Sequence, residues 1–462
     1  MTAVFAALLI LSGTTTAAGS GFQSKIDISV GNEPTDVVAA DIEGDGDIDL
    51  IVTNHASGTI SIIFNDGRGN FGAPVNYAVN APSSVCTTDL DNDGDSDLAV
   101  TEQSNGRVAV FRNDGTGSFG SSFNLLIGSY PQAIAAADID NDGNIDLLAA
   151  NTGNNNISLL RNLGGAVFDT TTYKFSGTAG PAAIVILDFN NDNYKDIALA
   201  NYGFDHIALL QNTKHLGFVS FISPYIGATQ SDISAFDYNK DGITDLITTS
   251  PEKTFLSLMT GKSDGTFDSA QKYTAGGNPY AAIGDDFNGD NYPDMAVANR
   301  YTGTVSILDN LQDGTFGYPA NFKVGNYPVA LCAADFDGDG DEDIVTANFG
   351  SGDISILFNL YHTPTDAPGV ETTLPADFRL EQNYPNPFNP KTTFPFYVSK
   401  KGSVRLDIYD LLGRLVATPV NKIFPAGEYR ISWDASRLNS GVYFYRLSGD
   451  GKNQARKMIL LK

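Results

Sequence analysis

A nine-residue acidic motif, Asp-x-Asp-x-Asp-Gly-x-x-Asp or a close variant, recurs seven times at intervals of 48 to 50 residues. A fixed period of this length indicates stacked supersecondary units, and seven units of this size indicate a closed ring. Between the motifs, short apolar and alternating runs bounded by turn residues predict four β-strands in each unit. The motifs begin at Asp41, Asp89, Asp138, Asp188, Asp237, Asp286 and Asp335.

The last repeat stops after its third predicted strand, at residues 355–358, and the missing strand has a counterpart near the N-terminus. Residues 22–34 align with residues 316–328, with Phe, Val-Gly-Asn and Pro in the same places. We therefore expect residues 22–30 to pair with the last repeat and close the ring, which leaves no exposed end unit. The predicted fold is all-β, with a seven-bladed β-propeller over residues 22–361.

The part of the chain beyond the repeats differs in composition and charge. Residues 362–377 contain three prolines and no periodicity, which predicts an extended linker. Residues 378–462 hold 14 basic and 6 acidic residues, whereas residues 1–377 hold 14 basic and 48 acidic ones. Alternating stretches at 404–409 and 441–447 predict a second domain, a small Ig-like β-sandwich over residues 378–462. The acidic part should repel nucleic acid and attract cations.

The N-terminus carries a short apolar run. Residues 3–11 are apolar and small residues follow them, with Ala17-Ala18-Gly19. This pattern predicts a secretory signal peptide over residues 1–18, although a basic segment is missing and a buried strand or a tail is the alternative. The run is too short to span a bilayer, and no other segment approaches that length. We therefore expect no transmembrane span in the mature chain.

The seven motifs have the composition of calcium loops. Numbering each loop from 1 to 9, we take the side chains at positions 1, 3, 5 and 9 as ligands, together with the backbone carbonyl of position 7, where the residue type varies freely. The predicted metal ligands are Asp41, Glu43, Asp45, Asp47 and Asp49 in loop 1; Asp89, Asp91, Asp93, Asp95 and Asp97 in loop 2; Asp138, Asp140, Asp142, Asn144 and Asp146 in loop 3; Asp188, Asn190, Asp192, Tyr194 and Asp196 in loop 4; Asp237, Asn239, Asp241, Ile243 and Asp245 in loop 5; Asp286, Asn288, Asp290, Tyr292 and Asp294 in loop 6; and Asp335, Asp337, Asp339, Asp341 and Asp343 in loop 7.

Electrostatics favours Ca²⁺ as the bound ion. Carboxylates this close together repel one another unless a cation lies among them, and a set of six to eight oxygens suits Ca²⁺ better than Mg²⁺. The loops contain no His or Cys, which argues against zinc. One loop alone would be a weak signal, with an Asx-turn cluster as the alternative, but seven in register favour a metal. Loops 1, 2, 3 and 7 hold four ligand acids and should bind most strongly. Gly or Asn at position 6 predicts a positive φ.

Two families resemble parts of this chain. The loops, their period and the turns Phe71-Gly72, Phe119-Gly120 and Phe316-Gly317 resemble FG-GAP/VCBS-type repeats, as in the integrin alpha propeller. The tail resembles the type IX secretion C-terminal sorting domain of Gram-negative bacteria, which implies the type IX secretion machinery as a partner and a secreted or outer-surface location. This second resemblance rests on Gln382-Asn-Tyr-Pro-Asn-Pro-Phe-Asn-Pro390, Tyr409-Asp-Leu-Leu-Gly-Arg414, Trp433-Asp434, Ser440-Gly-Val-Tyr443 and Arg456-Lys-Met-Ile-Leu-Leu-Lys462.

The sequence favours a binding function over catalysis. It contains no nucleophile elbow, no zinc-protease motif and no phosphate loop, and we predict that the protein is not an enzyme. The predicted function is a secreted or cell-surface binding or adhesion scaffold; the alternative is a secreted carbohydrate-active enzyme, a polysaccharide lyase or hydrolase with a carboxylate pair at the channel mouth. Aromatic residues gather on the predicted face opposite the calcium loops, as a ligand site or as packing between blades: His55, Tyr130, Tyr202, Phe204, His206, Tyr280, Tyr301, Tyr327 and Phe349.

Overall fold

A computed structural model shows an all-β chain that divides into two compact units, residues 1–364 and 365–462. The structure describes residues 21–360 except 176–178, 215–216 and 223–224. It also describes residues 378–462 except 381–382, 384–385, 387, 399, 412, 425–426 and 450–451. The predicted signal peptide, 1–18, and the predicted linker, 362–377, lie outside the described residues.

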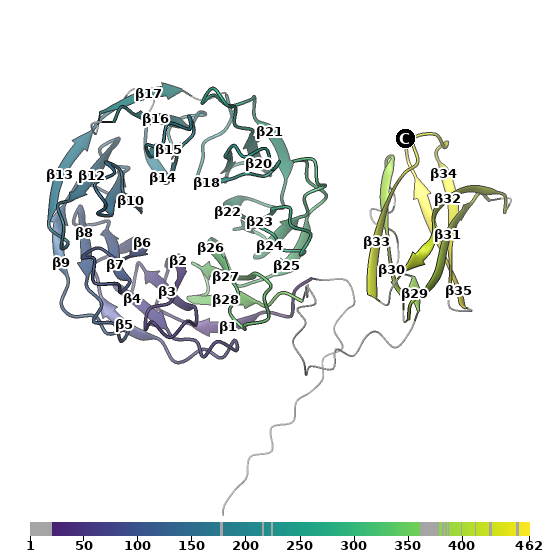
Figure 1. The fold of residues 1–462 in the computed structure, drawn as a ribbon, viewed down its shortest axis with the longest axis horizontal. Coiled ribbons are helices and arrows are strands. Elements are labelled where there is room, and N and C mark those ends of the chain that lie inside the picture. The colour runs from purple at the N-terminus through teal and green to yellow at the C-terminus, as the bar shows by residue number, and fades with distance from the viewer. Residues whose placement is uncertain are drawn as a thin grey trace, which may run out of the picture. The chain divides into compact units, whose positions relative to one another are not determined.

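The first unit is built from four-stranded antiparallel sheets that repeat along the chain. Seven such sheets follow one another around a ring, each with its first strand nearest the centre (Figure 1). The first strand of each sheet contacts the first strand of the next, and β26 contacts β2, so the ring of described strands is closed. These innermost strands are β2 (Pro34–Ala40), β6 (Pro82–Thr88), β10 (Pro131–Ala137), β14 (Pro181–Leu187), β18 (Asp232–Phe236), β22 (Pro279–Asp285) and β26 (Pro328–Ala334).

The second strands are fully buried and apolar in their centres, as expected for strands covered on both faces. They are β3 (Asp49–Asn54), β7 (Asp97–Glu102), β11 (Asp146–Asn151), β15 (Asp196–Asn201), β19 (Asp245–Thr249), β23 (Asp294–Asn299) and β27 (Asp343–Asn348). The third strands are β4 (Thr59–Ile63), β8 (Arg107–Phe111), β12 (Asn156–Asn162), β16 (Ala208–Asn212), β20 (Phe255–Met259), β24 (Thr304–Leu308) and β28 (Asp353–Leu357). The outermost strands are more exposed: β5 (Val75–Ala78), β9 (Phe123–Leu126), β13 (Phe168–Tyr173), β17 (Phe218–Ile222), β21 (Gln271–Thr274), β25 (Ala320–Lys323) and β1 (Ile26–Ser29).

The N-terminal segment closes the ring, as the sequence predicts. Strand β1 pairs antiparallel with β28, with Ile26 opposite Ile356 and Ser29 opposite Asp353. The order of the last sheet is therefore β1-β28-β27-β26. Phe22, which is 3% exposed, packs against the rings of neighbouring sheet residues and anchors the segment.

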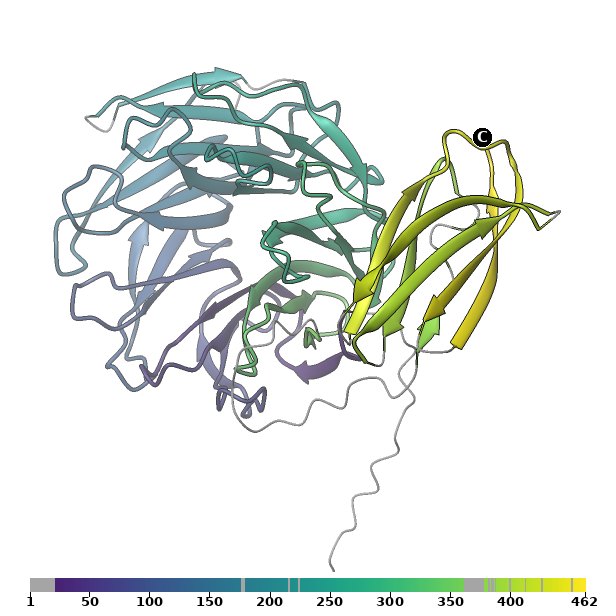
Figure 2. The ribbon, with the colours of Figure 1, turned by 45° about the vertical axis from the view of Figure 1, so that its right-hand side comes forward.

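Sheets of the first unit share apolar cores with their neighbours rather than each enclosing its own. One core joins Val37, Leu50 and Ile63 of the first sheet to Val345 and Ile356 of the last. Similar clusters join each of the other adjacent pairs around the ring. Figure 2 shows neighbouring sheets of the first unit following one another around this ring. Because a sheet alone leaves both apolar faces uncovered, each sheet is stable only between two others.

The second unit has two sheets around one hydrophobic core (Figure 1). Buried Phe394, Phe396, Leu406 and Tyr445 lie in this core. One sheet has the order β29-β30-β33 and the other β32-β31-β34-β35. Their strands are β29 (Arg379–Leu380), β30 (Lys391–Val398), β31 (Gly402–Tyr409), β32 (Leu415–Phe424), β33 (Gly427–Asp434), β34 (Gly441–Gly449) and β35 (Lys452–Leu460).

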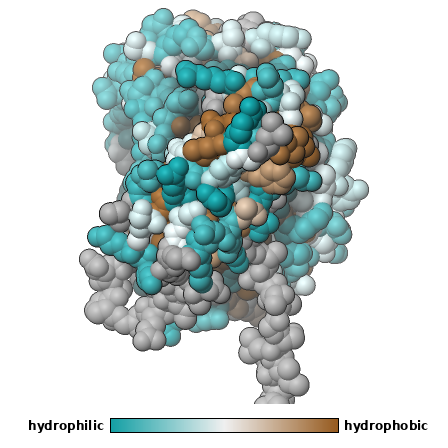
Figure 3. Space-filling view, turned by 90° about the vertical axis from the view of Figure 1, so that its right-hand side faces the viewer, coloured by the Kyte–Doolittle hydropathy of each residue, from teal (hydrophilic) through white to brown (hydrophobic). Residues whose placement is uncertain are grey.

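The face of the molecule that Figure 3 shows is mostly hydrophilic, with a limited area of hydrophobic residues. In the part of the chain that the structure describes, no helix has the length and hydrophobicity that a bilayer crossing requires.

Candidate functional site

Each acidic loop joins the first and second strands of one sheet, so all seven loops lie at the same end of the sheets. Position 1 organises each loop from within: in loop 7, Asp335 accepts hydrogen bonds from the backbone N–H groups of Gly338 at 2.8 Å and Gly340 at 2.9 Å. The N–H of position 6 donates to position 1 in all seven loops.

The backbone of the loops follows the sequence prediction and adds one feature. Position 6 has a positive φ in every loop, from 64° at Asn291 to 99° at Gly94, which confirms the predicted left-handed bend. Position 4 also has a positive φ in every loop, including Lys240 at 59°. Positions 4 and 6 are both left-handed, and they direct the carboxylate of position 5, which lies between them, back toward the loop. This carboxylate accepts the N–H of position 7.

The final Asp of each loop is buried and holds the loop to its sheet. In loop 7, Asp343 is 0% exposed and accepts hydrogen bonds from the N–H groups of Phe336 at 3.0 Å and Asn359 at 2.7 Å. The pKa of Asp343 is raised to about 8, chiefly by burial; the two backbone hydrogen bonds oppose this shift and the nearby carboxylates add to it. The charged form of this residue is therefore costly at neutral pH unless a cation lies beside it.

Three loops bring carboxylate oxygens together closely enough to hold one ion. Within each of these groups the oxygens lie within 4.8 Å of one another. The groups are Asp89, Asp91 and Asp97 in loop 2; Asp138, Asp140 and Asp146 in loop 3; and Asp335, Asp337 and Asp339 in loop 7. These are three of the four loops for which the sequence predicts the strongest binding.

The same three loops contain buried carboxylate oxygens that lack hydrogen-bond partners. They are the Oδ1 atoms of Asp91, Asp140 and Asp337, all at position 3. A buried acceptor without a partner costs free energy, and a hard cation would satisfy it. The donor set in these loops, all oxygen and rich in carboxylate, therefore fits Ca²⁺.

Arginines lie beside two of these loops. Arg112 lies 3.5 Å from Asp91 in loop 2, and Arg161 pairs with Asp140 in loop 3. These ion pairs partly offset the negative charge at position 3 of loops 2 and 3.

The remaining predicted ligands form looser groups. Loop 1 has Glu43 at position 3, and its acids do not form such a group among the described residues. In loops 4, 5 and 6 the Asn at position 3 accepts the N–H of position 5 instead. The predicted carbonyl ligand at position 7 stays a prediction in all seven loops.

The sequence analysis missed an asparagine that ties the loops of neighbouring sheets together. It lies sixteen residues after the last Asp of its loop, and its Nδ2 donates to the position 2 carbonyl of the preceding loop. The recurrence of Asn at this fixed offset was the available signal. These residues are Asn65, Asn113, Asn162, Asn212, Asn310 and Asn359; Gly261 replaces Asn in the fifth sheet.

Replacing one of these asparagines should weaken the ring with or without calcium. Asn113 is buried and donates to the carbonyl groups of Ile42 at 2.7 Å and Ser96 at 3.1 Å. We expect Asn113→Ala to lower the free energy of unfolding by about 1–3 kcal/mol, measured by urea denaturation. Asn70→Ala is the matched control, since Asn70 is exposed and bonds only within its own turn to Asp66. Equal losses for both variants would contradict the role of Asn113.

The opposite end of the sheets carries the predicted aromatic residues, and several of them contact one another. The Tyr202 and Tyr280 hydroxyls lie 3.1 Å apart, and the rings of Tyr301 and Tyr327 lie 6.2 Å apart. Tyr301 is 72% exposed and Tyr327 47%. Packing between sheets therefore does not account for all of these rings.

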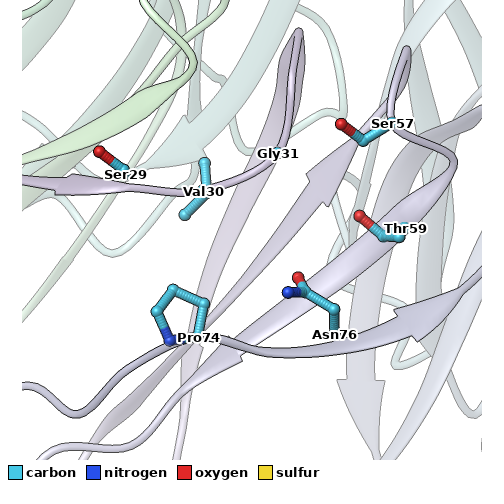
Figure 4. Close-up of a pocket in the computed structure, with 7 residues that line it drawn as sticks. All are labelled: Ser29, Val30, Gly31, Ser57, Thr59, Pro74 and Asn76. Atoms are coloured by element: carbon cyan, nitrogen blue, oxygen red, sulfur yellow. The ribbon is translucent and has the colours of Figure 1, made fainter.

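A separate hollow of about 370 Å³ lies where β1 meets the first sheet (Figure 4). None of its lining residues is charged, and two of its polar atoms already have partners: Ser57 Oγ accepts the N–H of Asn32, and Asn76 Oδ1 accepts the Ser61 hydroxyl. The hollow lies at the place where the N-terminal strand closes the ring. It is lined by Ser29, Val30, Gly31, Ser57, Thr59, Pro74 and Asn76.

Three solved structures that are similar to this chain share little sequence identity with it. A functionally unknown protein from Desulfotomaculum acetoxidans has 13% identity and a TM-score of 0.46, covering 64% of this chain and 91% of its own. A protein from Lactobacillus plantarum has 12% identity and a TM-score of 0.46, covering 86% and 98%. A protein from Bacteroides uniformis described as a candidate 6-phosphogluconolactonase has 14% identity and a TM-score of 0.48, covering 68% and 88%. We draw no conclusion about activity from these similarities.

No curated protein matches the chain significantly. Two family models do match. The FG-GAP-like repeat matches five times, over residues 41–100, 89–149, 138–199, 188–248 and 286–346, and together these matches span more than half of the chain. The secretion system C-terminal sorting domain matches residues 382–461 and indicates export, followed by release or attachment at the cell surface. The chain therefore belongs to the FG-GAP-like repeat family and carries a secretion system C-terminal sorting domain.

Proposed function

We propose that this protein is a secreted or cell-surface, calcium-binding, seven-bladed β-propeller that acts as a binding or adhesion scaffold. In this proposal the propeller covers residues 22–361, and the linker covers residues 362–377. Residues 378–462 form an Ig-like sandwich that the type IX secretion machinery recognises. The loops hold calcium at one end of the blades, and the aromatic residues at the other end contact the ligand.

The observation that carries the calcium assignment is the coincidence of two features in loops 2, 3 and 7. Their carboxylate oxygens converge within 4.8 Å, and each loop has a buried position 3 oxygen without a hydrogen-bond partner. Bound Ca²⁺ would supply a positive charge and accept these oxygens as ligands, while the backbone hydrogen bonds to positions 1 and 9 fix the loop around it. The metal would then stabilise the junction between the first two strands of each blade.

The assignment is tested by calorimetric titration with calcium of the full-length protein after a chelator has removed bound metal. We expect at least three calcium ions per chain, with dissociation constants on the order of 10⁻⁴ to 10⁻³ M, as in other extracellular modules. Magnesium at the same concentrations should bind more weakly, because it keeps its water ligands. Fewer than three bound calcium ions would refute the assignment.

A further inference from the structure

One cation lies among the aromatic residues at the end of the sheets opposite the acidic loops. The guanidinium carbon of Arg300 is 4.9 Å from the ring centre of Tyr280, 5.6 Å from that of Phe349 and 5.8 Å from that of Tyr327. Tyr280 continues the cluster to Tyr202 through the contact between their hydroxyls. The cluster thus joins residues of the fourth, sixth and seventh sheets.

Arg300 has no anionic partner within the described part of the chain. No carboxylate there forms an ion pair with it. Its Nε is buried and lacks a hydrogen-bond partner. A buried, charged donor without an acceptor is unfavourable, and this arginine lies in a unit with a large excess of acids that could have supplied one.

The equivalent residues of other sheets show what this position otherwise does. It lies six residues after the last Asp of the loop, immediately after the second strand. In the first sheet the His55 ring nitrogen lies 3.1 Å from the carbonyl oxygen of Pro82, and in the third the Thr152 hydroxyl donates to that of Pro181 at 2.7 Å. These contacts join adjacent sheets. Arg300 instead reaches the next sheet through the rings of Tyr327 and Phe349, a contact that leaves its Nε without a hydrogen-bond acceptor.

We propose that Arg300 and the rings around it bind the anionic group of an extracellular saccharide, either the carboxylate of a uronic acid or a sulfate ester. This proposal rests on the binding-scaffold function and specifies the ligand class of its aromatic face. The planar guanidinium fork matches both oxyanions and binds them by paired, charge-assisted hydrogen bonds. Surrounding rings exclude water from the ion pair and strengthen it.

The polar groups nearby favour a saccharide over an acidic peptide. The Tyr202 and Tyr280 hydroxyls can both donate and accept, which suits sugar hydroxyls. Asn278 is 8% exposed; its backbone carbonyl accepts the N–H of Arg300 at 3.0 Å, and its side-chain Oδ1 is buried without a partner. The exposed ring of Tyr301 offers a flat apolar surface to the C–H groups of a sugar ring. The acidic charge of the unit would repel long polyanions, so we expect short or sparsely charged saccharides to bind.

The test is calorimetric titration of the full chain, in calcium, with four probes: a galacturonic acid trimer, its methyl ester, a sulfated galactose trimer and a tripeptide of aspartate. We expect the acid trimer, the sulfated trimer or both to bind, which identifies the anion. The uncharged ester should bind at least about tenfold more weakly than the acid, because it loses the charge-assisted bonds. Binding of the peptide alone, equal binding of acid and ester, or no binding of any saccharide would overturn the proposal.

Two variants assign the binding to this residue. Arg300→Gln should weaken binding of the charged saccharide about tenfold or more. Lys323→Gln should leave it unchanged, because Lys323 contacts the same turn, at the Thr302 carbonyl, but is exposed on the outermost strand. If Arg300→Gln lowers the Tm, the variant Arg300→Lys decides the question. It keeps the positive charge and should therefore bind the charged saccharide more tightly than Arg300→Gln. Equal affinities of both variants and the wild type would overturn the proposal. Calcium binding without saccharide binding would refute this inference alone, whereas loss of calcium binding would refute the proposed function.

Discussion

Deleting residues 22–30 is expected to open the ring and to produce aggregates or strand-swapped dimers. The last sheet would lose its outermost strand, and the third strand of that sheet, β28, would present unpaired backbone groups to other chains. The deletion also removes Phe22, whose buried ring contacts Phe287 and Phe322. Removing a buried Phe side chain alone costs about 3–5 kcal/mol. We expect calorimetry to show a fall in Tm of roughly 10 °C or more, and light scattering to detect the aggregates or dimers.

Point variants separate the loss of pairing from the loss of a single contact. Phe22→Ala should destabilise the monomer but leave it closed, since β1 keeps its backbone pairing. Ile26→Ala should have little effect, because Ile26 is 48% exposed. A deletion variant that stays monomeric with an unchanged Tm would rule out closure by this segment.

Chelation of calcium is expected to lower the Tm strongly. An ion that binds the folded loop and not the unfolded chain adds about 2.7 kcal/mol of stability at a free concentration one hundred times its dissociation constant. Three occupied loops would therefore add about 8 kcal/mol. Scanning calorimetry with and without chelator measures the difference, and magnesium should restore only part of it.

The matched variants Asp335→Ala and Asp286→Ala locate this effect. Both remove position 1 of a loop, and both remove hydrogen bonds to the backbone N–H of position 6. In the wild type, loop 7 has a converging group of three carboxylates that includes Asp335, whereas loop 6 has Asn288 at position 3. In calcium, Asp335→Ala should lower the Tm more than Asp286→Ala, and in chelator the two should be similar. Equal shifts in calcium would argue against loop 7 as a metal site.

The repeat period was enough to predict the strand order and the closing segment, because both follow from chain geometry alone. The pairing of β1 with β28 confirms the alignment of residues 22–34 with residues 316–328. The bend at position 6 was predictable because only Gly and Asn occur there. Position 4 was not predicted, since Lys240 in the fifth loop obscures the same preference.

The candidate sites were less predictable because they depend on side-chain geometry. The seven loops are similar in sequence, but only three of them bring carboxylate oxygens together among the described residues. All three have an Asp with a buried Oδ1 at position 3. The asparagines that tie neighbouring loops together, such as Asn113 and Asn162, donate to a carbonyl of a different repeat from their own. The pattern within one repeat therefore does not reveal them. Arg300 was missed because a single cation has no period, and its significance lies in the rings around it.

The closing segment also determines where the two ends of the described first unit meet. The Leu360 N–H donates to the Gly21 carbonyl at 2.7 Å, so the described chain enters and leaves the ring at one point on the last sheet. Asn359 bonds to the last Asp of loop 7, which places this point at the end of the sheets that carries the acidic loops. A pulling force applied through residue 360 would therefore act first on the last sheet, and the rings around Arg300 lie at the opposite end of the strands from residue 360.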